Sequence, residues 1–354
     1  MKIGVPREIK TLEGRVALIP SAAGQLVSEG HEVYVEKGAG RLSGYSDEAY
    51  RSNRVQLVDS AEELFATSQL IVKVKEPQPT EVAMLREDHL LFSYLHLAAA
   101  TDLMQDLLDI GLTAVAFETV ETDSGALPLL APMSDIAGRV AVQVGAHYLH
   151  QPQGGKGLLL GGLPAAERGH VVVLGGGVAG GNATAMAAGI GAQVTVFDRN
   201  REKLAHMRSF GNNVTALYPY PDALREAVIN ADLLVGAVLV TGERAPHLVS
   251  ADTVAQMTDG SVIIDISVDQ GGCIETTRPT NYAEPTYMWE GIVHFAVTNM
   301  PGAVPRSASQ ALSAVLLPYV LALSEDNWDR HAGLRAGVNV SAGKVVYPVL
   351  AENR

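Results

Sequence analysis

Short runs of apolar and β-branched residues alternate with helix-length amphipathic segments along almost the whole chain. Continuous apolar runs of roughly four to eight residues are typical of strands buried on both faces of a sheet. Helices are predicted between such runs, over Ala22–Glu29, Ala61–Ala66 and Ala100–Asp109. This alternation indicates an α/β fold with parallel sheets that helices cover on both faces. The predicted strands are Lys2–Val5, Glu32–Glu36, Leu70–Val74, Leu90–Leu95, Thr113–Thr119, Val171–Leu174, Val194–Phe197, Asp232–Val238, Ser261–Ile266 and His294–Val297.

Two doubly wound, Rossmann-like domains with a cleft between them are the architecture that this order of elements predicts. The 354 residues suit two domains, at roughly 150 residues for each. Ser134 is predicted to cap a helix over Asp135–His150. A long apolar helix is predicted from Ser307 to Leu323. The predicted boundaries are 1–130 for the first domain, 131–300 for a second, inserted domain, and 301–354 for the return of the chain to the first.

Composition narrows the possible functions. The chain has 26 Lys and Arg residues against 39 Asp and Glu residues, a formal net charge of −13, which argues against non-specific binding to nucleic acid or anionic lipid. The single cysteine, Cys273, excludes a disulfide within the chain and a cysteine-based zinc site. The N-terminal stretch MKIGVPREIK has no apolar signal segment, and the longest apolar run, Ala311–Leu323, is too short to span a bilayer. We therefore expect a soluble cytoplasmic protein that binds neither nucleic acid nor membrane.

The strongest local signal is a glycine fingerprint, G-x-G-x-x-G, at Gly175–Gly180, directly after the predicted strand Val171–Leu174. In dinucleotide-binding domains the first glycine, here Gly175, allows a tight turn. The second, Gly177, lets the pyrophosphate approach the backbone, and the third, Gly180, lets the helix pack closely against the strand. Backbone N–H groups at the N-terminus of the following helix then face the phosphates.

An acidic residue stands where dinucleotide-binding domains bind the hydroxyl groups of the adenosine ribose. Asp198 ends the strand that follows the fingerprint helix, where a carboxylate accepts hydrogen bonds from the adenosine ribose. Because that carboxylate repels a 2′-phosphate, NAD is predicted over NADP, although Arg199 and Arg201 weaken the preference.

Longer motifs lie outside the fingerprint and extend over nearly the whole chain. They are Ile3–Lys10 with Glu13–Leu18, Gly30–Val33, Glu36–Gly40, Lys73–Pro77, Ser93–Ala98, Ala131–Ser134, Asp265–Cys273 and Thr298–Pro305. In these motifs the chain resembles the alanine dehydrogenase family, which also includes the NAD-binding subunit of proton-translocating transhydrogenase. The resemblance implies reversible, NAD-dependent oxidative deamination of L-alanine to pyruvate and ammonium. It also implies a homo-oligomer, expected to be a hexamer.

The resemblance further implies two substrate-binding and two catalytic residues. Arg15 would hold the substrate carboxylate through its planar guanidinium, and Lys75 would polarise the carbonyl with a positive charge. His96 would be catalytic, because an imidazole at this strand end can relay protons as water adds to the imine and ammonia departs. Asp269 would be the second acid–base group or would orient substrate and nicotinamide ribose. On the residue pattern alone, other interpretations remain open for these residues: a surface arginine, a strand-end lysine and a buried structural histidine.

The resemblance implies cofactor contacts in several segments. Tyr220 stands where the family often has a small serine near the adenine, and its ring is expected to stack there instead. No metal is predicted: some relatives suggest one between a glutamate like Glu118 and a C-terminal histidine, but Ser324–Asp329 contains no histidine. The implied contacts are Ser134, Gly175, Gly177, Val178, Ala179, Gly180, Asp198, Lys203, Tyr220, Leu239, Val240, Ile266, Ser267, Val268, Asp269, Arg278, Val297, Thr298, Asn299 and Met300.

A stripe of small residues predicts where subunits associate. Ala137, Ala141 and Gly145 recur at helical spacing, with Gly138 beside them. Together with the apolar helix Ser307–Leu323, the stripe offers more packing surface than a hinge between two domains needs. Identical subunits are therefore expected to meet through this region.

Two other functions remain open on the sequence. A soluble transhydrogenase component would bind NAD but no amino acid, and would need no proton relay at His96. A non-catalytic NAD-binding protein would keep the fingerprint while losing at least one of the implied substrate-binding and catalytic residues, all of which are present. The sequence does not fix the preference among small amino acids, because one methylene changes binding by only about 1–3 kcal/mol. It does not indicate the physiological direction either.

Overall fold

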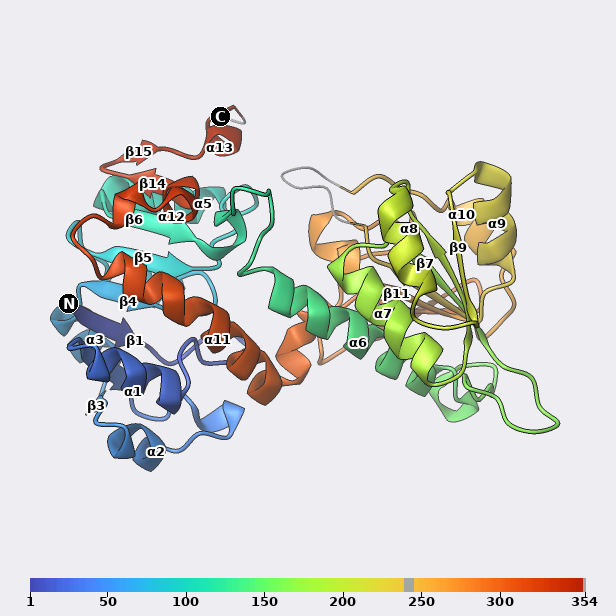
Figure 1. Ribbon diagram of the computed structural model, residues 1–354, viewed down its shortest axis with the longest axis horizontal. Helices are drawn as coiled ribbons and strands as arrows, with labels where there is room; N and C mark the ends of the chain where they lie inside the picture. Colours follow the sequence, from blue (N-terminus) through green and yellow to red (C-terminus); the bar gives the residue numbers. More distant parts are fainter. Residues whose placement is uncertain (239–244, 353–354) are drawn as a thin grey trace. The chain divides into compact units, whose positions relative to one another are not determined.

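The computed structural model describes residues 1–238 and 245–352 (Figure 1). The chain divides into two compact units, one formed by Met1–Met133 with the residues from Val304 onward, the other by Ser134–Ala303. The boundaries predicted from the sequence lie three residues earlier at each junction. Leu239 and Val240, which were predicted to contact the cofactor, lie outside the described residues.

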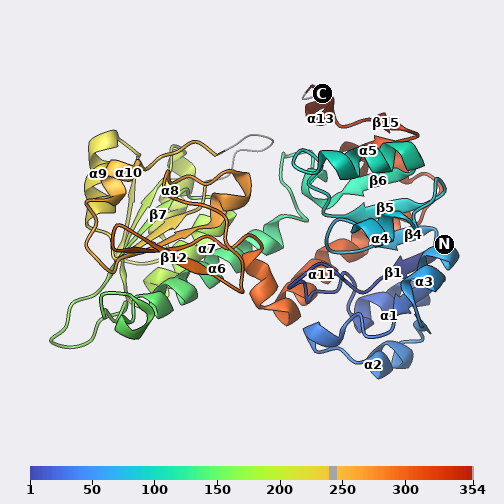
Figure 2. The same ribbon diagram turned by 180° about the vertical axis from the view of Figure 1, so that it is seen from behind.

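The first unit is an eight-stranded sheet with helices on both faces. Helices α3 and α5 cover one face, and α1 and α11 cover the other (Figures 1 and 2). The strand order is β15-β14-β6-β5-β4-β1-β2-β3. The strands are β1 Lys2–Val5, β2 Glu32–Glu36, β3 Gln56–Val58, β4 Leu70–Val72, β5 Leu90–Ser93, β6 Thr113–Ala116, β14 Val338–Ser341 and β15 Lys344–Val345. The helices are α1 Pro20–Ser28, α2 Asp47–Ser52, α3 Ala61–Thr67, α4 Pro79–Val82, α5 Thr101–Ile110, α11 Pro305–Leu323, α12 Ala332–Ala336 and α13 Pro348–Glu352.

The second unit is a seven-stranded sheet in the order β12-β13-β11-β10-β7-β8-β9. Its strands are β7 His170–Leu174, β8 Gln193–Phe197, β9 Val214–Leu217, β10 Leu233–Gly236, β11 Val262–Asp265, β12 Thr286–Trp289 and β13 Ile292–Phe295. Its helices are α6 Ala131–Tyr148, which begins just before the unit boundary, α7 Val178–Gly189, α8 Arg201–Arg208, α9 Pro221–Ile229 and α10 Ala251–Val254.

Both sheets contain the strand order of a doubly wound α/β fold. Each sheet contains a run of this kind, β3-β2-β1-β4-β5-β6 and β9-β8-β7-β10-β11-β13. In each run the chain adds strands on one side of its first strand, β1 or β7, and then continues on the other side of that strand. In such sheets, ligands bind beyond the carboxyl ends of the strands at the point where the order reverses. That point lies between β1 and β4 in the first unit and between β7 and β10 in the second. The predicted α/β, doubly wound fold is confirmed, except that β12, β14 and β15 add antiparallel edges.

Two predicted elements differ from the structure near the site. The strand expected over Thr113–Thr119 ends at Ala116 and continues as a 3₁₀ turn over Phe117–Thr119. The helix expected from Asp135 begins at Ala131, so Ser134 lies within its first turn and does not cap it. Pro132 explains the earlier start, because proline is favoured in a first helical turn, where its missing N–H costs no hydrogen bond.

The stripe of small residues on α6 is filled from within the second unit. A Cβ at Gly138 would overlap the carbonyl oxygen of Ala179 on α7, and one at Gly145 would press on Leu233 of β10. This corrects the expectation that subunits meet at the stripe. Helix α11 packs in the first unit, where the backbone N–H of Val16 donates to Ser309 Oγ at 2.9 Å.

Replacing Gly138 by alanine is expected to lower the free energy of unfolding by about 1–3 kcal/mol, because α6 and α7 must separate to admit the methyl group. Gly189→Ala, in α7, is the matched control: a Cβ there meets nothing within 4 Å, and the change is expected to be neutral or stabilising. Urea unfolding of both variants measures the difference. Equal effects would mean that α6 and α7 do not pack this closely.

Candidate active site

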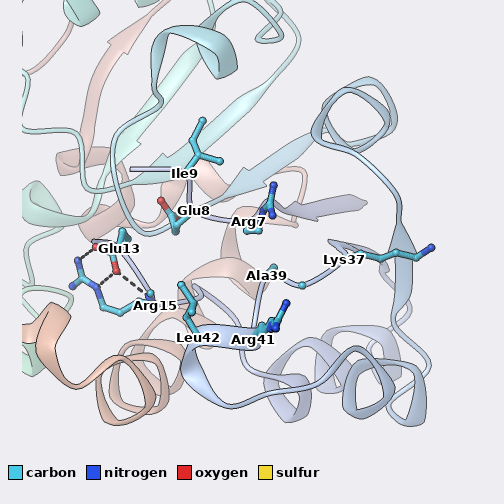
Figure 3. A pocket seen from close by; sticks show the side chains of 11 residues that line it. Arg7, Glu8, Ile9, Glu13, Arg15, Lys37, Ala39, Arg41 and Leu42 are labelled. Carbon is cyan, nitrogen blue, oxygen red and sulfur yellow. Dashed lines mark hydrogen bonds and ion pairs between the residues drawn. The ribbon is translucent and has the colours of Figure 1, made fainter. Parts of the chain in front are cut away.

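A pocket of about 690 Å³ opens at the carboxyl ends of β1 and β2 (Figure 3). The loop after β1 forms one wall, and the segment after β2 forms the other. Its cationic lining contrasts with the negative net charge of the chain. The lining residues are Arg7, Glu8, Ile9, Glu13, Gly14, Arg15, Lys37, Gly38, Ala39, Arg41 and Leu42.

Arg15 lies in this pocket and is only 3% exposed, which excludes the surface-arginine interpretation. Its Nε and Nη2 donate to the two carboxylate oxygens of Glu13 at 2.7 and 2.6 Å, as the dashed lines of Figure 3 show. Burial acts to raise the pKa of Glu13, but hydrogen bonds from Arg15 hold that pKa below its ordinary value. Burial acts to lower the pKa of Arg15, and Glu13 raises it on balance. The pair is therefore ionised at neutral pH, and Glu13 fixes the plane of the guanidinium.

Lys75 follows β4, on the other side of the point where the strand order reverses. It is half-buried, and it does not line the pocket itself. Its backbone N–H faces Glu8 Oε2 at 3.4 Å. The positive charge of Lys75 also contributes to lowering the pKa of Glu13. Lys75 therefore interacts electrostatically with Glu13, and its role in substrate binding stays a prediction.

His96 lies just beyond the end of β5, and its side chain is 49% exposed, so it is not a buried structural histidine. Its ring stacks on Tyr94 with centroids 5.9 Å apart and an angle of 3° between the planes. Its backbone has a φ of +50°, a left-handed conformation that side chains rarely adopt. Burial raises the pKa of Tyr94, and the charge of Arg15 acts to lower it.

Glu118 holds the loop that presents His96, a role that sequence reasoning missed. The backbone N–H groups of Leu95 and His96 donate to its carboxylate at 3.2 and 2.5 Å. The same carboxylate lies 3.8 Å from His96 Nδ1. Glu118 thus stabilises the left-handed backbone and faces the imidazole.

The glycine fingerprint has the geometry that a dinucleotide requires. Gly175 has a φ of +97°, and a Cβ at Gly180 would overlap the carbonyl oxygen of Gly175. A Cβ at Gly177 would meet nothing within 4 Å, so open space stands where a pyrophosphate would approach. Val178 and Ala179 begin α7, whose first backbone N–H groups point towards that space. The residues present therefore fit a dinucleotide.

Asp198 holds the fingerprint loop in place. Its Oδ2 accepts a hydrogen bond from the backbone N–H of Gly176 at 2.7 Å, and its Oδ1 accepts one from Asn200 at 2.7 Å. A carboxylate has about four acceptor positions, so ribose hydroxyls can bind as well. Lys203 lies beside Gly176. Tyr220 is 66% exposed as a residue, which leaves its ring accessible for stacking.

A buried carboxylate orients the turn that carries Asp269. Asp265 accepts hydrogen bonds from the backbone N–H groups of Ser267 at 2.9 Å and Cys273 at 3.0 Å. Ser267 Oγ accepts from the backbone N–H of Val238 at 2.9 Å, which joins this turn to the end of β10. Ile266, Val268 and the exposed Asp269 complete the 3₁₀ turn.

The remaining predicted contacts follow β11 and β13. The backbone N–H of Arg278 donates to Tyr287 Oη at 2.9 Å, and its guanidinium lies 4.3 Å from the centre of the Tyr287 ring. Val297 and Thr298 pair with the strand-like segment at Thr280. Asn299 has a φ of +81°, and Tyr282 donates to the carbonyl of Met300 at 2.7 Å.

Two features bear on other kinds of site. No group of three or more His, Cys, Asp or Glu side chains in residues 1–238 and 245–352 is arranged to hold a metal ion. Among the same residues, every helix is too short or too polar to cross a lipid bilayer.

Comparison with known proteins identifies the family. Residues 4–137 match the model "Alanine dehydrogenase/PNT, N-terminal domain", and residues 141–348 match "Alanine dehydrogenase/PNT, C-terminal domain". The alanine dehydrogenase of Halomonas elongata is 48% identical, over 99% of this chain and 96% of its own. That of Bacillus subtilis is 46% identical, over 100% and 94%. A solved L-alanine dehydrogenase is 49% identical, covers 100% of both chains and superposes with a TM-score of 0.96. The chain belongs to the alanine dehydrogenase/PNT family.

Proposed function

We propose that this chain is an NAD-dependent L-alanine dehydrogenase, which converts L-alanine reversibly to pyruvate and ammonium. The observation that carries the proposal is the position of Arg15, Lys75 and His96. All three follow strands at the carboxyl edge of one sheet, where Arg15 contacts Glu13, Lys75 contacts Glu8 and His96 stacks on Tyr94. Two cations that can bind a carboxylate, and an exposed imidazole at the same edge of the sheet, suit an amino-acid substrate that must gain and lose protons.

The reaction needs each group in turn. Arg15 and Lys75 bind the substrate carboxylate, and the charge of Lys75 favours nucleophilic attack at the substrate carbon by polarising the group bonded to it. NAD, when bound, supplies the acceptor for the hydride that leaves this carbon. His96 takes a proton from the water that adds to the resulting imine, and returns one to the departing ammonia. Asp269 serves as the second acid–base group or orients the substrate. The overall change is L-alanine, NAD⁺ and water to pyruvate, ammonium, NADH and a proton.

The proposal is tested by NADH formation at alkaline pH with L-alanine beside L-serine, glycine and L-glutamate. We expect the highest kcat/KM with L-alanine. No NADH formation with L-alanine would refute the assignment. Hydride exchange between two nicotinamide nucleotides without any amino acid would instead favour a transhydrogenase component.

Asp198→Ser is expected to admit NADP and to raise the ratio of kcat/KM for NADP over NAD about tenfold or more, because a repulsive carboxylate is removed. The loss of the hydrogen bond from Gly176 should also weaken NAD binding. Asp252→Ser, at an exposed acid of α10, is the matched control and should leave the ratio unchanged. Should the Asp198 variant keep a strong NAD preference, another group must read the ribose.

We further propose that the enzyme works in the cytoplasm as a homo-hexamer. The family membership supports the assembly, and the single cysteine, Cys273, which is buried and unpaired, is compatible with a reducing compartment. Light scattering of the purified protein measures the oligomer size, and a monomer at micromolar concentration would contradict this part of the proposal.

A further inference from the structure

Glu8 joins the ends of two strands where the order of the first sheet reverses. It follows β1, yet its Oε1 accepts a hydrogen bond from the backbone N–H of Val74, beyond β4, at 2.6 Å. Its Oε2 lies 3.4 Å from the backbone N of Lys75 and 3.3 Å from Lys73 Nζ. The carboxylate is only 3% exposed although Glu8 lines the pocket, next to Glu13 and Arg15 in Figure 3. One carboxylate therefore contacts three successive residues of the segment that presents Lys75.

Neutralising the charge of Lys73 does not by itself explain why the Glu8 carboxylate is buried at this position. The ammonium of Lys73 is fully buried, and Glu81 Oε2 already lies 3.0 Å from it. Glu81 also accepts a hydrogen bond from the backbone N–H of Gln78 at 2.8 Å, at the start of α4. Two buried carboxylates thus face one buried ammonium. Besides Lys73, Glu81 accepts a hydrogen bond at the start of α4, whereas Glu8 accepts hydrogen bonds from the backbone at Val74 and Lys75.

The electrostatics of the pocket include Glu8. Burial raises its pKa, Lys73 acts to lower it, and the negative charge of Glu13 adds to the increase. The negative charge of Glu8 in turn contributes to raising the pKa of Arg15. Glu8 and Arg15 therefore interact electrostatically in the pocket that both residues line.

We propose that Glu8 is a positioning residue that fixes the backbone from Lys73 to Lys75 and so sets where the Lys75 ammonium meets the substrate. The inference deepens the proposed function and rests on it, since Lys75 is taken as a substrate-binding residue. Glu8 itself need not touch the substrate. Its effect should appear in substrate binding and should pass through Lys75.

The experiment compares Glu8→Gln with Glu81→Gln. Each variant leaves Lys73 with one carboxylate, so similar decreases in Tm are expected. Only in Glu8→Gln does an amide N–H₂ face the N–H of Lys75, so only there should KM for pyruvate and L-alanine rise, by about 10- to 100-fold. The Kd for NADH should stay within about twofold in both variants, because neither residue is in the dinucleotide unit. Equal increases in KM would show that Glu8 only neutralises Lys73, and would overturn the proposal.

Two further variants keep the test decisive if Glu8→Gln folds poorly. Glu8→Asp keeps the charge but is one methylene shorter, so it should hold Tm near that of the wild type while KM still rises. Against a Lys75→Ala background, Glu8→Asp should change KM by less than about twofold, because two residues that act through one group are not additive. A full, additive effect in that background would overturn the proposal, as would a wild-type KM in Glu8→Asp. Loss of alanine-dependent NADH formation by the wild type itself would refute the proposed function instead.

Discussion

His96→Ala is expected to lower kcat for L-alanine oxidation by about 10²–10⁴-fold, the usual contribution of a positioned acid–base group. The half-exposed imidazole beside Glu118 and Tyr94 is the group able to relay protons at the end of β5. The Kd for NADH should stay within about threefold, because His96 lies in the first unit and the fingerprint lies in the second. Stopped-flow or steady-state rates and a fluorescence titration with NADH measure the two quantities separately.

Two companion variants separate chemistry from backbone strain. Asparagine adopts the left-handed backbone of residue 96 more readily than alanine does, but it does not titrate, so His96→Asn should fold well and still lack activity. His31→Ala is the matched histidine control, because His31 precedes β2, at the opposite edge of the sheet from the carboxyl ends. It should retain full activity. Loss of NADH binding together with activity in both His96 variants would mean that His96 is structural.

The buried strands of both sheets were predictable from local sequence, while the edge strands were not. Strands β1 and β2 have the predicted bounds, because parallel strands buried on both faces need continuous apolar runs. The edge strands β3 and β9 carry exposed residues and show no such run. Strand β14 pairs antiparallel with β6, from far along the chain, and no local pattern indicates that partner.

The same distinction applies to the site. The fingerprint glycines and Asp198 could be placed from sequence because their roles depend on a strand, a turn and a helix that are contiguous. Glu8 and Glu118 could not, since their carboxylates accept backbone N–H groups 66 and 22 residues away. Their function lies in fixing the segments that carry Lys75 and His96. Only the folded sheet, in which strand ends from separate parts of the chain meet, brings them into contact.

Arg15→Met is expected to damage both substrate binding and stability. KM for pyruvate should rise by about 100-fold, because a charge-assisted partner of the substrate carboxylate is lost. The free energy of unfolding near neutral pH should fall by about 3–5 kcal/mol, since the buried Glu13 carboxylate loses the guanidinium that donates to both of its oxygens. Glu13 is 0% exposed at its side chain, so solvent does not compensate for the missing guanidinium.

The stability difference should depend on pH with a defined sign. In the wild type the pKa of Glu13 lies below its ordinary value of 4.5. The ion pair with Arg15 therefore stabilises the fold above pH 4.5, and this stabilisation is lost as the pH falls through the folded pKa. In Arg15→Met the hydrogen bonds and the charge of Arg15 no longer oppose burial, although the charge of Lys75 still does, so the folded pKa of Glu13 rises and the variant gains less stability than the wild type as the pH increases. The difference between the two proteins should therefore grow from about pH 4 to pH 7.

Urea unfolding of both proteins at several pH values between about 4 and 7 measures this difference. Adding Glu13→Gln to Arg15→Met removes the buried negative charge, so most of the stability should return and the pH dependence should disappear. The raised KM should persist in the double variant, because the amide at position 13 restores no cation for the substrate. A stability difference that does not change with pH would mean that Arg15 and Glu13 are not paired in solution. Recovery of KM in the double variant would mean that Arg15 supports the fold of the pocket without binding the substrate.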